Sequence, residues 1–265
     1  MTVRALAFDV FGTLVDWRSA IARAFRAAGV AGDPEQLADA WRAGVWPILG
    51  EVNEGRRSWL TFDEVHRVTL DELLAERGLE LPVDTRDELV EAWHRLDPWP
   101  DVRAGLERLR RRRVVAALSN GNVSLLIDLA RYGDLRFDCL LSAEMARRYK
   151  PAAEVYVTGV RMLGLEPDEV MLVAAHPWDL EGGRSAGLRT AFVDRPVEYG
   201  PGSPARKFRI GLGQLFLDAR FEDSRRPRFH GRRCRFKAAG GDCECEFCPE
   251  TLGRPKRARP PGPDL

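Results

Sequence analysis

Short apolar segments alternate with amphipathic helical segments between residues 98 and 200. The pattern predicts strands over residues 114–118, 137–142, 170–174 and 190–193, and helices over residues 102–112, 124–132, 153–163 and 180–186. Strands that alternate with helices in this way form parallel βαβ units. We therefore predict an α/β fold with a doubly wound parallel sheet and a Rossmann-like core.

One more strand-like segment, residues 4–10, lies near the N-terminus and is separated from the others by a long helical stretch. From residue 16 to about residue 96 the apolar residues follow helical spacing, with helices expected over residues 19–28, 34–49, 62–77 and 85–96. We expect residues 1–15 and 98–200 to form the catalytic core and residues 16–97 to form an inserted helical cap. The catalytic cleft should lie between them.

Residues 201–265 follow neither period and are rich in Arg, Pro and Gly. From Arg220 onward there are 12 basic and 7 acidic residues, although the net charge of the whole chain is only +1. Such a segment predicts a basic, largely disordered tail that does not bind nucleic acid. A non-native terminus, caused for example by a frame shift, is an alternative. The tail also carries four of the five cysteines, Cys234, Cys243, Cys245 and Cys248, but their spacing matches no common zinc module.

The composition indicates a globular protein with one substantial core. No apolar run approaches the roughly 18 to 20 residues of a membrane helix. The N-terminus also lacks the basic and then apolar pattern of a signal peptide. We expect a cytoplasmic protein with no membrane partner.

Polar residues follow the ends of several predicted strands. Asp9 ends the first strand, Ser119 and Asn120 follow the second, Asp179 follows a later one, and Lys150 lies in a loop before Pro151. Ligands of open α/β sheets bind outside the carboxyl ends of the strands. These residues therefore predict a single site.

Four motifs carry a resemblance to a known family: Phe8-Asp9-Val10-Phe11-Gly12-Thr13-Leu14, Ser119-Asn120-Gly121, Lys150-Pro151 and Trp178-Asp179. In order and spacing they resemble the haloacid dehalogenase superfamily, and within it the (S)-2-haloacid dehalogenase branch. The resemblance covers about residues 4–200. It implies a hydrolase that acts on carbon–halide bonds, a small 2-haloacid as the substrate, and a homodimer as one possible assembly.

The resemblance makes Asp9 the covalent nucleophile, because a carboxylate can attack carbon or phosphorus and leave an ester or acyl phosphate that water hydrolyses. The alternative for Asp9 is a turn or capping role. Thr13 matches the threonine that steadies the nucleophile in the family, and a plain turn role is its alternative.

Two positions favour carbon–halogen cleavage over phosphate hydrolysis. Superfamily phosphatases usually carry a second Asp two residues after the nucleophile, where this chain has Phe11, which cannot donate a proton. A halide leaves without protonation. The acidic residue that holds magnesium in phosphatases is replaced by Ala175. We therefore expect no metal and no other cofactor; a phosphatase of small phosphorylated metabolites is the alternative function, and a catalytically dead scaffold is a third.

Lys150 is expected beside Asp9, where its charge would keep the nucleophile ionised, and Asp179 is expected to hold Lys150 and orient water. A surface ion pair is the alternative. Ser119 and Asn120 suit hydrogen bonding to a substrate carboxylate near a helix N-terminus. Helix capping alone would explain one polar residue of this turn, Ser119 or Asn122.

In the cap, Trp41-Arg42 resembles the Trp-Arg pair whose arginine receives the departing halide, with a solvated helix arginine as the alternative. Tyr156 and Trp178 match pocket positions of the family, although both are also ordinary core residues. Many relatives read Ser-Ser-Asn where this chain has Ala174-Ala175-His176. His176 is therefore either a general base for ester hydrolysis or a structural histidine.

Overall fold

The computed structural model describes residues 2–200, and its core is a five-stranded parallel sheet with the order β3-β2-β1-β4-β5. The strands are β1 (Ala5–Phe8), β2 (Val114–Ser119), β3 (Cys139–Ser142), β4 (Val170–Ala174) and β5 (Arg189–Phe192). All neighbouring strands pair in parallel. The predicted doubly wound α/β fold is confirmed.

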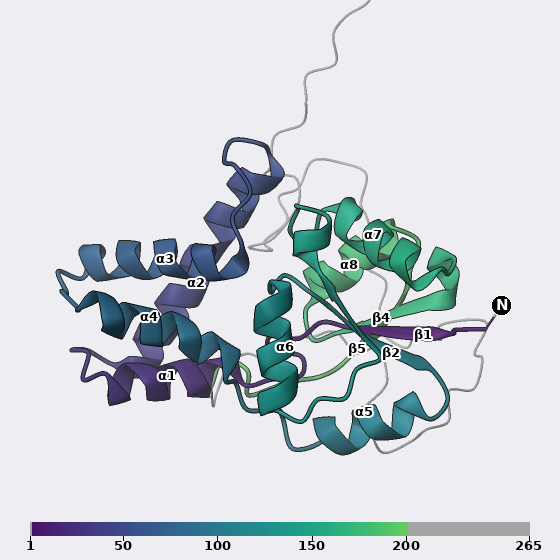
Figure 1. Ribbon diagram of the computed structural model, residues 1–265, viewed down its shortest axis with the longest axis horizontal. Coiled ribbons are helices and arrows are strands. Elements are labelled where there is room, and N and C mark those ends of the chain that lie inside the picture. The colour runs from purple at the N-terminus through teal and green to yellow at the C-terminus, as the bar shows by residue number, and fades with distance from the viewer. Residues whose placement is uncertain (1, 201–265) are drawn as a thin grey trace, which may run out of the picture. The chain divides into compact units, whose positions relative to one another are not determined.

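Helices cover both faces of the sheet. They are α5 (Val102–Arg110), α6 (Val123–Tyr132), α7 (Ala153–Leu163) and α8 (Pro177–Ser185). Figure 1 shows α5 on one side of the strands and α7 and α8 on the other, and right-handed crossovers place α6 with α5. Central strand β1 is buried along its whole length, which explains its uninterrupted apolar sequence.

The chain between β1 and α5 is helical, as its spacing predicted. It forms α1 (Trp17–Ala27), α2 (Pro34–Asn53), α3 (Phe62–Glu76), α4 (Val83–Glu91) and the short η1 (Ala92–His94). Local signals set the starts of three of these helices: the Asp16 and Asp33 side chains cap α1 and α2, and a Thr61–Glu64 capping box begins α3. The predicted helix over residues 85–96 is in fact α4 followed by the 3₁₀ turn η1.

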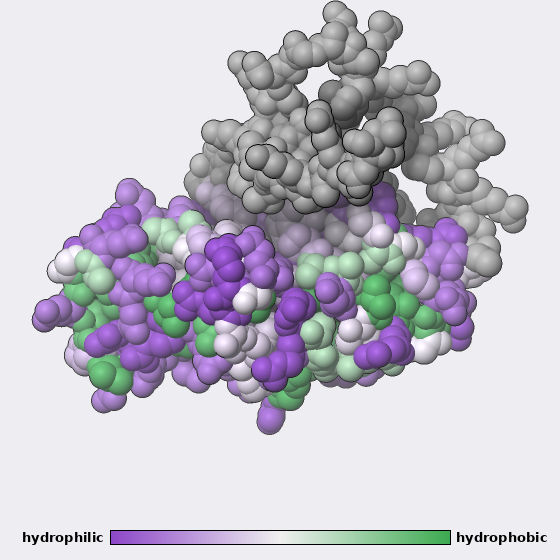
Figure 2. Space-filling model, turned by 90° about the horizontal axis from the view of Figure 1, so that it is seen from above, coloured by the Kyte–Doolittle hydropathy of each residue, from purple (hydrophilic) through white to green (hydrophobic). Residues whose placement is uncertain are grey.

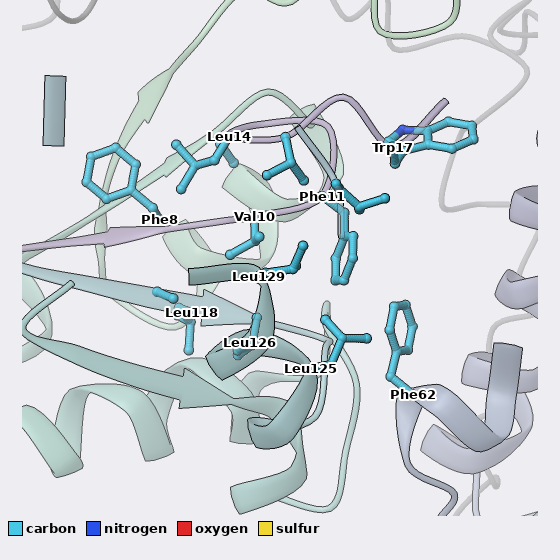
Figure 3. Packing of buried hydrophobic residues seen from close by; sticks show 14 of the residues in the cluster. Phe8, Val10, Phe11, Leu14, Trp17, Phe62, Leu118, Leu125, Leu126 and Leu129 are labelled. Carbon is cyan, nitrogen blue, oxygen red and sulfur yellow. The ribbon is translucent and has the colours of Figure 1, made fainter. Parts of the chain in front are cut away.

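Aromatic and aliphatic side chains join this helical segment to the sheet. Phe11, just after β1, points toward Phe62 at the start of α3, with ring centroids 5.4 Å apart, above the leucines of α6 (Figure 3). The short η2 (Ala143–Met145) and η3 (Pro167–Glu169) connect core elements. The division into core (residues 1–15 and 98–200) and cap (residues 16–97) stays a prediction.

A histidine also links the two parts. His94 of η1 lies between Asp63 of α3 and Asp128 of α6, with ring nitrogen to carboxylate distances of 3.1 Å and 2.8 Å. Burial lowers the pKa of His94, but the two carboxylates outweigh burial and raise it to about 9. Asn122 donates to Asp63 as well, at 2.8 Å. The helical segment is thus tied to α6 by polar contacts beside the aromatic ones.

Hydrophobic and hydrophilic residues are interspersed on the face of residues 2–200 drawn in Figure 2. Among the described helices, none is long and apolar enough to cross a membrane. The predicted tail, with its cysteines and arginine clusters, lies outside the described residues.

Candidate active site

The register of the sheet brings three strand ends to one edge. Phe8 lies opposite Ala117 on β2 and Val173 on β4. Asp9, directly after Phe8, therefore lies at the level where β2 and β4 end, and its backbone N–H donates to the Val173 carbonyl at 3.0 Å. The predicted convergence of polar residues from separate loops at this edge follows from parallel pairing.

The Asp9 carboxylate is buried and receives three hydrogen bonds. Oδ2 accepts from the Thr13 hydroxyl at 2.7 Å and lies 3.0 Å from Nδ1 of His176, whereas Oδ1 accepts from Nζ of Lys150 at 3.3 Å. The Thr13 hydroxyl itself accepts from the Ala175 backbone N–H at 2.9 Å. Burial raises the pKa of Asp9, but Lys150, His176 and Thr13 together hold it well below its ordinary value. Asp9 is therefore an ionised, oriented carboxylate.

Lys150 is fully buried between two carboxylates. Its Nζ lies 2.7 Å from Oδ2 of Asp179 and 3.3 Å from Asp9. The pKa of Lys150 is lowered by burial but raised more strongly by these two charges. Burial raises the pKa of Asp179, against the opposing charge of Lys150. The lysine thus lies beside Asp9, in the place that the sequence predicted, and the surface ion pair proposed as its alternative is wrong.

Tyr156 of α7 contacts Asp179 directly. Its hydroxyl donates to Oδ1 of Asp179 at 2.7 Å, and the ring is fully buried. Burial and the Asp179 charge raise the pKa of Tyr156, so the phenol keeps its proton. The structure therefore assigns Tyr156 a contact with Asp179, and the role of pocket residue stays a prediction.

His176 lies between two carboxylates, and the second of them was missed by the sequence analysis. Nδ1 is 3.0 Å from Oδ2 of Asp9, and Nε2 is 2.9 Å from Oε1 of Glu198, which also accepts from Nε1 of Trp17 at 3.2 Å. Burial lowers the pKa of His176, but the hydrogen bonds and charges of Asp9 and Glu198 raise it to about 9. These contacts favour the protonated form of the ring.

Glu198 reaches this place because the chain after β5 returns over the loop that contains Gly12 and Thr13. Arg195 anchors the returning segment by donating to the Thr13 carbonyl at 2.9 Å and to Asp101 at 2.9 Å. Gly12 has a φ of +78°, and a Cβ there would overlap the Glu198 carboxylate. Nothing local marks Glu198 in the sequence, because its role depends on where this segment returns.

Ser119, the last residue of β2, and Asn120, the next one, accept hydrogen bonds from backbone N–H groups of the protein. The Asn120 side chain accepts from the Lys150 backbone N–H at 2.8 Å, and Oγ of Ser119 accepts from the Gly121 N–H at 3.2 Å. Asn122 occupies the N-cap position of α6 without a capping side-chain bond; Glu144 instead accepts from the Val123 N–H at 2.9 Å. The alternative that helix capping explains Ser119 or Asn122 is therefore wrong, because Glu144 of η2 supplies the carboxylate at the start of this helix.

Arg42 of α2 is buried in an aromatic cluster. Its guanidinium carbon lies between 5.6 and 5.8 Å from the ring centroids of Phe11, Trp17, Trp46 and Trp93. Within residues 2–200 its Nη1 has no hydrogen-bond partner, and neither does the indole nitrogen of Trp93. Burial lowers the pKa of Arg42 while Tyr199, Glu198 and Asp9 raise it, with a net lowering. A buried donor without an acceptor suits an anionic ligand, and the predicted alternative of a solvated arginine is wrong.

Two predicted aromatic positions face the same region. Phe11 packs against Phe62 and Trp93, so it is an apolar wall beside Asp9 and cannot supply a proton. Trp178 stacks on His176 at 5.6 Å and meets Trp46 edge to face at 5.0 Å. Trp178 thus bridges the core and α2.

The side chains that contact the Asp9 carboxylate include two with basic nitrogen groups, Lys150 and His176. Within the described part of the chain, no group of three or more His, Cys, Asp or Glu side chains is arranged to hold a metal ion. Where phosphatases carry a metal carboxylate, this chain has the methyl side chain of Ala175, whose backbone N–H donates to Thr13. The arrangement suits attack by a carboxylate on a small anionic substrate, with cations on either side.

Comparison with known proteins gives consistent matches. The family model of a haloacid dehalogenase-like hydrolase matches residues 3–187. The (S)-2-haloacid dehalogenase of Pseudomonas sp. strain YL is 30% identical over 196 residues, which are 73% of this chain and 83% of that protein.

Solved structures agree. The crystal structure of an L-2-haloacid dehalogenase is 45% identical with a TM-score of 0.74, covering 77% of this chain and 89% of that one. The L-2-haloacid dehalogenase of Xanthobacter autotrophicus, with chloropropionic acid covalently bound, is 29% identical with a TM-score of 0.67, covering 73% of this chain and 78% of that one.

Proposed function

Because the chain belongs to the haloacid dehalogenase-like hydrolases, we propose that it removes halide from a small 2-haloacid and produces a 2-hydroxy acid through an ester on Asp9. The observation that carries the proposal is the pairing of an ionised, buried Asp9 with a buried Arg42 whose Nη1 has no acceptor in the described chain. Relatives named (S)-2-haloacid dehalogenases support this substrate class.

In the first step Asp9 attacks C2 of the substrate from the side opposite the halogen. The C–halogen bond breaks, and the halide takes the bonding electron pair toward Arg42 and Asn120. Attack from the side opposite the halogen inverts the configuration at C2. Lys150, 3.3 Å from Asp9, keeps the nucleophile ionised, and the aromatic rings around Arg42 give the leaving halide a dry, cationic site.

In the second step water hydrolyses the ester and regenerates Asp9. Asp179 is the carboxylate we assign to orient this water, since it is held by Lys150 at 2.7 Å and Tyr156 at 2.7 Å. Ser119 and Asn120 lie at the N-terminal side of α6, where a substrate carboxylate is stabilised by the helix dipole. Thr13 and Trp178 complete the set of residues we assign to the site.

A phosphatase is the competing function, and the surroundings of Phe11 argue against it. Phe11 is 3% exposed and packed against Phe62 and Trp93, so this position supplies no proton to an alkoxide leaving group. A scaffold without catalysis is disfavoured by the connected Asp9, Lys150 and Asp179 network, because buried charges that serve no reaction are costly.

The test is halide release from racemic 2-chloropropionate, measured with and without EDTA. We expect release that is insensitive to EDTA and stops when about half of the racemate is consumed, since the relatives are named for the (S) enantiomer. Magnesium-dependent hydrolysis of p-nitrophenyl phosphate without halide release would replace the proposal by a phosphatase.

Replacing Arg42 by Met should reduce activity without reducing stability. We expect halide release to fall by about 10²-fold or more, as when one charge-stabilising donor is lost. The free energy of unfolding should stay the same or rise, because a buried guanidinium nitrogen without a partner costs free energy. Initial rates and urea unfolding measure the two effects.

Arg18→Met is the matched control for this variant. The Arg18 guanidinium binds Asp39 at 2.7 and 2.8 Å, so its replacement should leave turnover near the wild-type value. Equal losses of turnover in both variants would contradict the assignment of Arg42.

A further inference from the structure

Both ring nitrogens of His176 face carboxylate oxygens. Nδ1 lies 3.0 Å from Asp9 and Nε2 lies 2.9 Å from Glu198. A neutral imidazole has a single N–H and can donate to only one of them. The same Glu198 oxygen accepts from the Trp17 indole, which can only donate, so this oxygen acts as an acceptor. A doubly protonated ring satisfies both contacts.

We propose that Glu198 is a positioning residue that holds His176 as a histidinium, and that His176 acts on Asp9 as a cationic hydrogen-bond donor and not as a general base. This inference rests on the proposed dehalogenation and assigns the two residues a role within it. Glu198 acts through His176 and touches no reacting atom.

The contacts of Asp9 then decide which of its oxygens reacts. Oδ2 accepts hydrogen bonds from Thr13 and His176, at 2.7 and 3.0 Å, whereas among residues 2–200 Oδ1 has only the longer contact to Lys150, at 3.3 Å. Oδ1 therefore forms the bond to C2 while the halide leaves with its electron pair, and Oδ2 becomes the carbonyl oxygen of the ester.

Hydrolysis uses the same two donors. Water adds to Cγ of Asp9, and negative charge develops on Oδ2, where the Thr13 hydroxyl and the His176 cation stabilise it. The Cγ–Oδ1 bond then breaks, and Oδ1 leaves as the hydroxyl oxygen of the product. One proton of the water ends on that hydroxyl, and the other is released to solvent. The oxygen of the water stays on Asp9.

The charges around His176 fix the sign of the expected pH dependence. The ionisable groups of the described chain that act on this region include Asp9, Lys150, Asp179, Tyr156, Arg42, Glu198 and Tyr199. Burial opposes the cation, but the two contacting carboxylates outweigh burial and give His176 a pKa of about 9. The ring is thus charged below about pH 9 and neutral above it. A donor role predicts that turnover is lost above this pH, whereas a base would gain activity there.

The test compares Glu198→Gln with Asp194→Asn, using the dependence of kcat on pH for 2-chloropropionate. Asp194 lies in the same segment and is exposed. Its variant therefore removes one negative charge that does not contact His176. We expect the alkaline limb of Glu198→Gln to move down by at least about 1 pH unit, since the variant lacks a contacting charge. Asp194→Asn should match the wild type. An unmoved limb in Glu198→Gln would overturn the proposal.

His176→Asn provides a second, independent test. Its amide keeps an N–H donor but has neither charge nor basicity, so we expect reduced turnover without the alkaline limb. The Asp9 ester should accumulate, as detected by intact mass, because the cationic donor also serves ester hydrolysis. An alkaline limb that persists in His176→Asn would overturn the proposal. Titration of ¹⁵N-labelled histidine by NMR reports the charge of His176 directly. It needs no turnover, so it distinguishes failure of this inference from failure of the proposed function.

Discussion

Asp9→Asn is expected to abolish halide release, with kcat falling at least about 10⁴-fold, as when a covalent nucleophile is removed. The amide has nearly the shape of the carboxylate, and its oxygen can still accept from Thr13 or Lys150, which contact Asp9 at 2.7 and 3.3 Å. The loss should therefore come from chemistry and not from unfolding. Ion chromatography of released chloride and thermal unfolding measure the two properties.

A second measurement detects the ester on Asp9 directly. After rapid quenching of the wild type with substrate, peptide mapping should find the propionate adduct on the peptide that contains Asp9, and none in the variant. Asp16→Asn is a suitable control, because Asp16 caps α1 through the Ser19 N–H at 3.1 Å and lies outside the Asp9 network. Turnover by Asp9→Asn near the wild-type rate would exclude the covalent mechanism.

Lys150→Met should reduce both stability and turnover. Removing the lysine leaves Asp9 and Asp179 buried without their shared cation, and breaking one side of a buried ion pair typically costs about 3–5 kcal/mol. Turnover should fall about 10³-fold or more, because the pKa of Asp9 rises when its largest stabilising charge is lost. Urea unfolding and halide release are the measurements.

The double variant Lys150→Met with Asp179→Asn separates the two losses. Neutralising Asp179 removes one of the two stranded charges, and its amide oxygen can still accept from Tyr156. We expect part of the unfolding free energy to return while turnover stays low. Recovery of turnover together with stability would mean that Lys150 serves only the fold.

The sheet was predictable because burial on both faces leaves an unbroken apolar sequence. β4 (Val170–Ala174) and α7 (Ala153–Leu163) have the predicted bounds. The predicted helix over residues 180–186 begins at Pro177 instead. Proline is tolerated there because the first position of a helix needs no backbone N–H donor. Local periodicity thus gives the type and order of elements, and capping chemistry decides where they begin.

The four motifs contain Asp9, Thr13, Lys150 and Asp179, and His176 stands where the chain departs from the family pattern. The structure joins these five residues in one hydrogen-bonded network. Parallel strands that end at one edge make most of this outcome derivable, because Asp9 and Asp179 follow the ends of strands, whereas Lys150 lies in the loop after η2. Their catalytic roles remain proposals.

The partners of these residues came only from the tertiary structure. Glu198 approaches His176 because the chain returns after β5, and Trp17 and Trp93 surround Arg42 because α1 and η1 pack against α2. Periodicity reports only whether a segment has a buried face. It carries no information about which distant segment covers that face. The sequence by itself thus determined the fold class and the family motifs, whereas the three-dimensional packing decided the partners of His176 and the aromatic surroundings of Arg42.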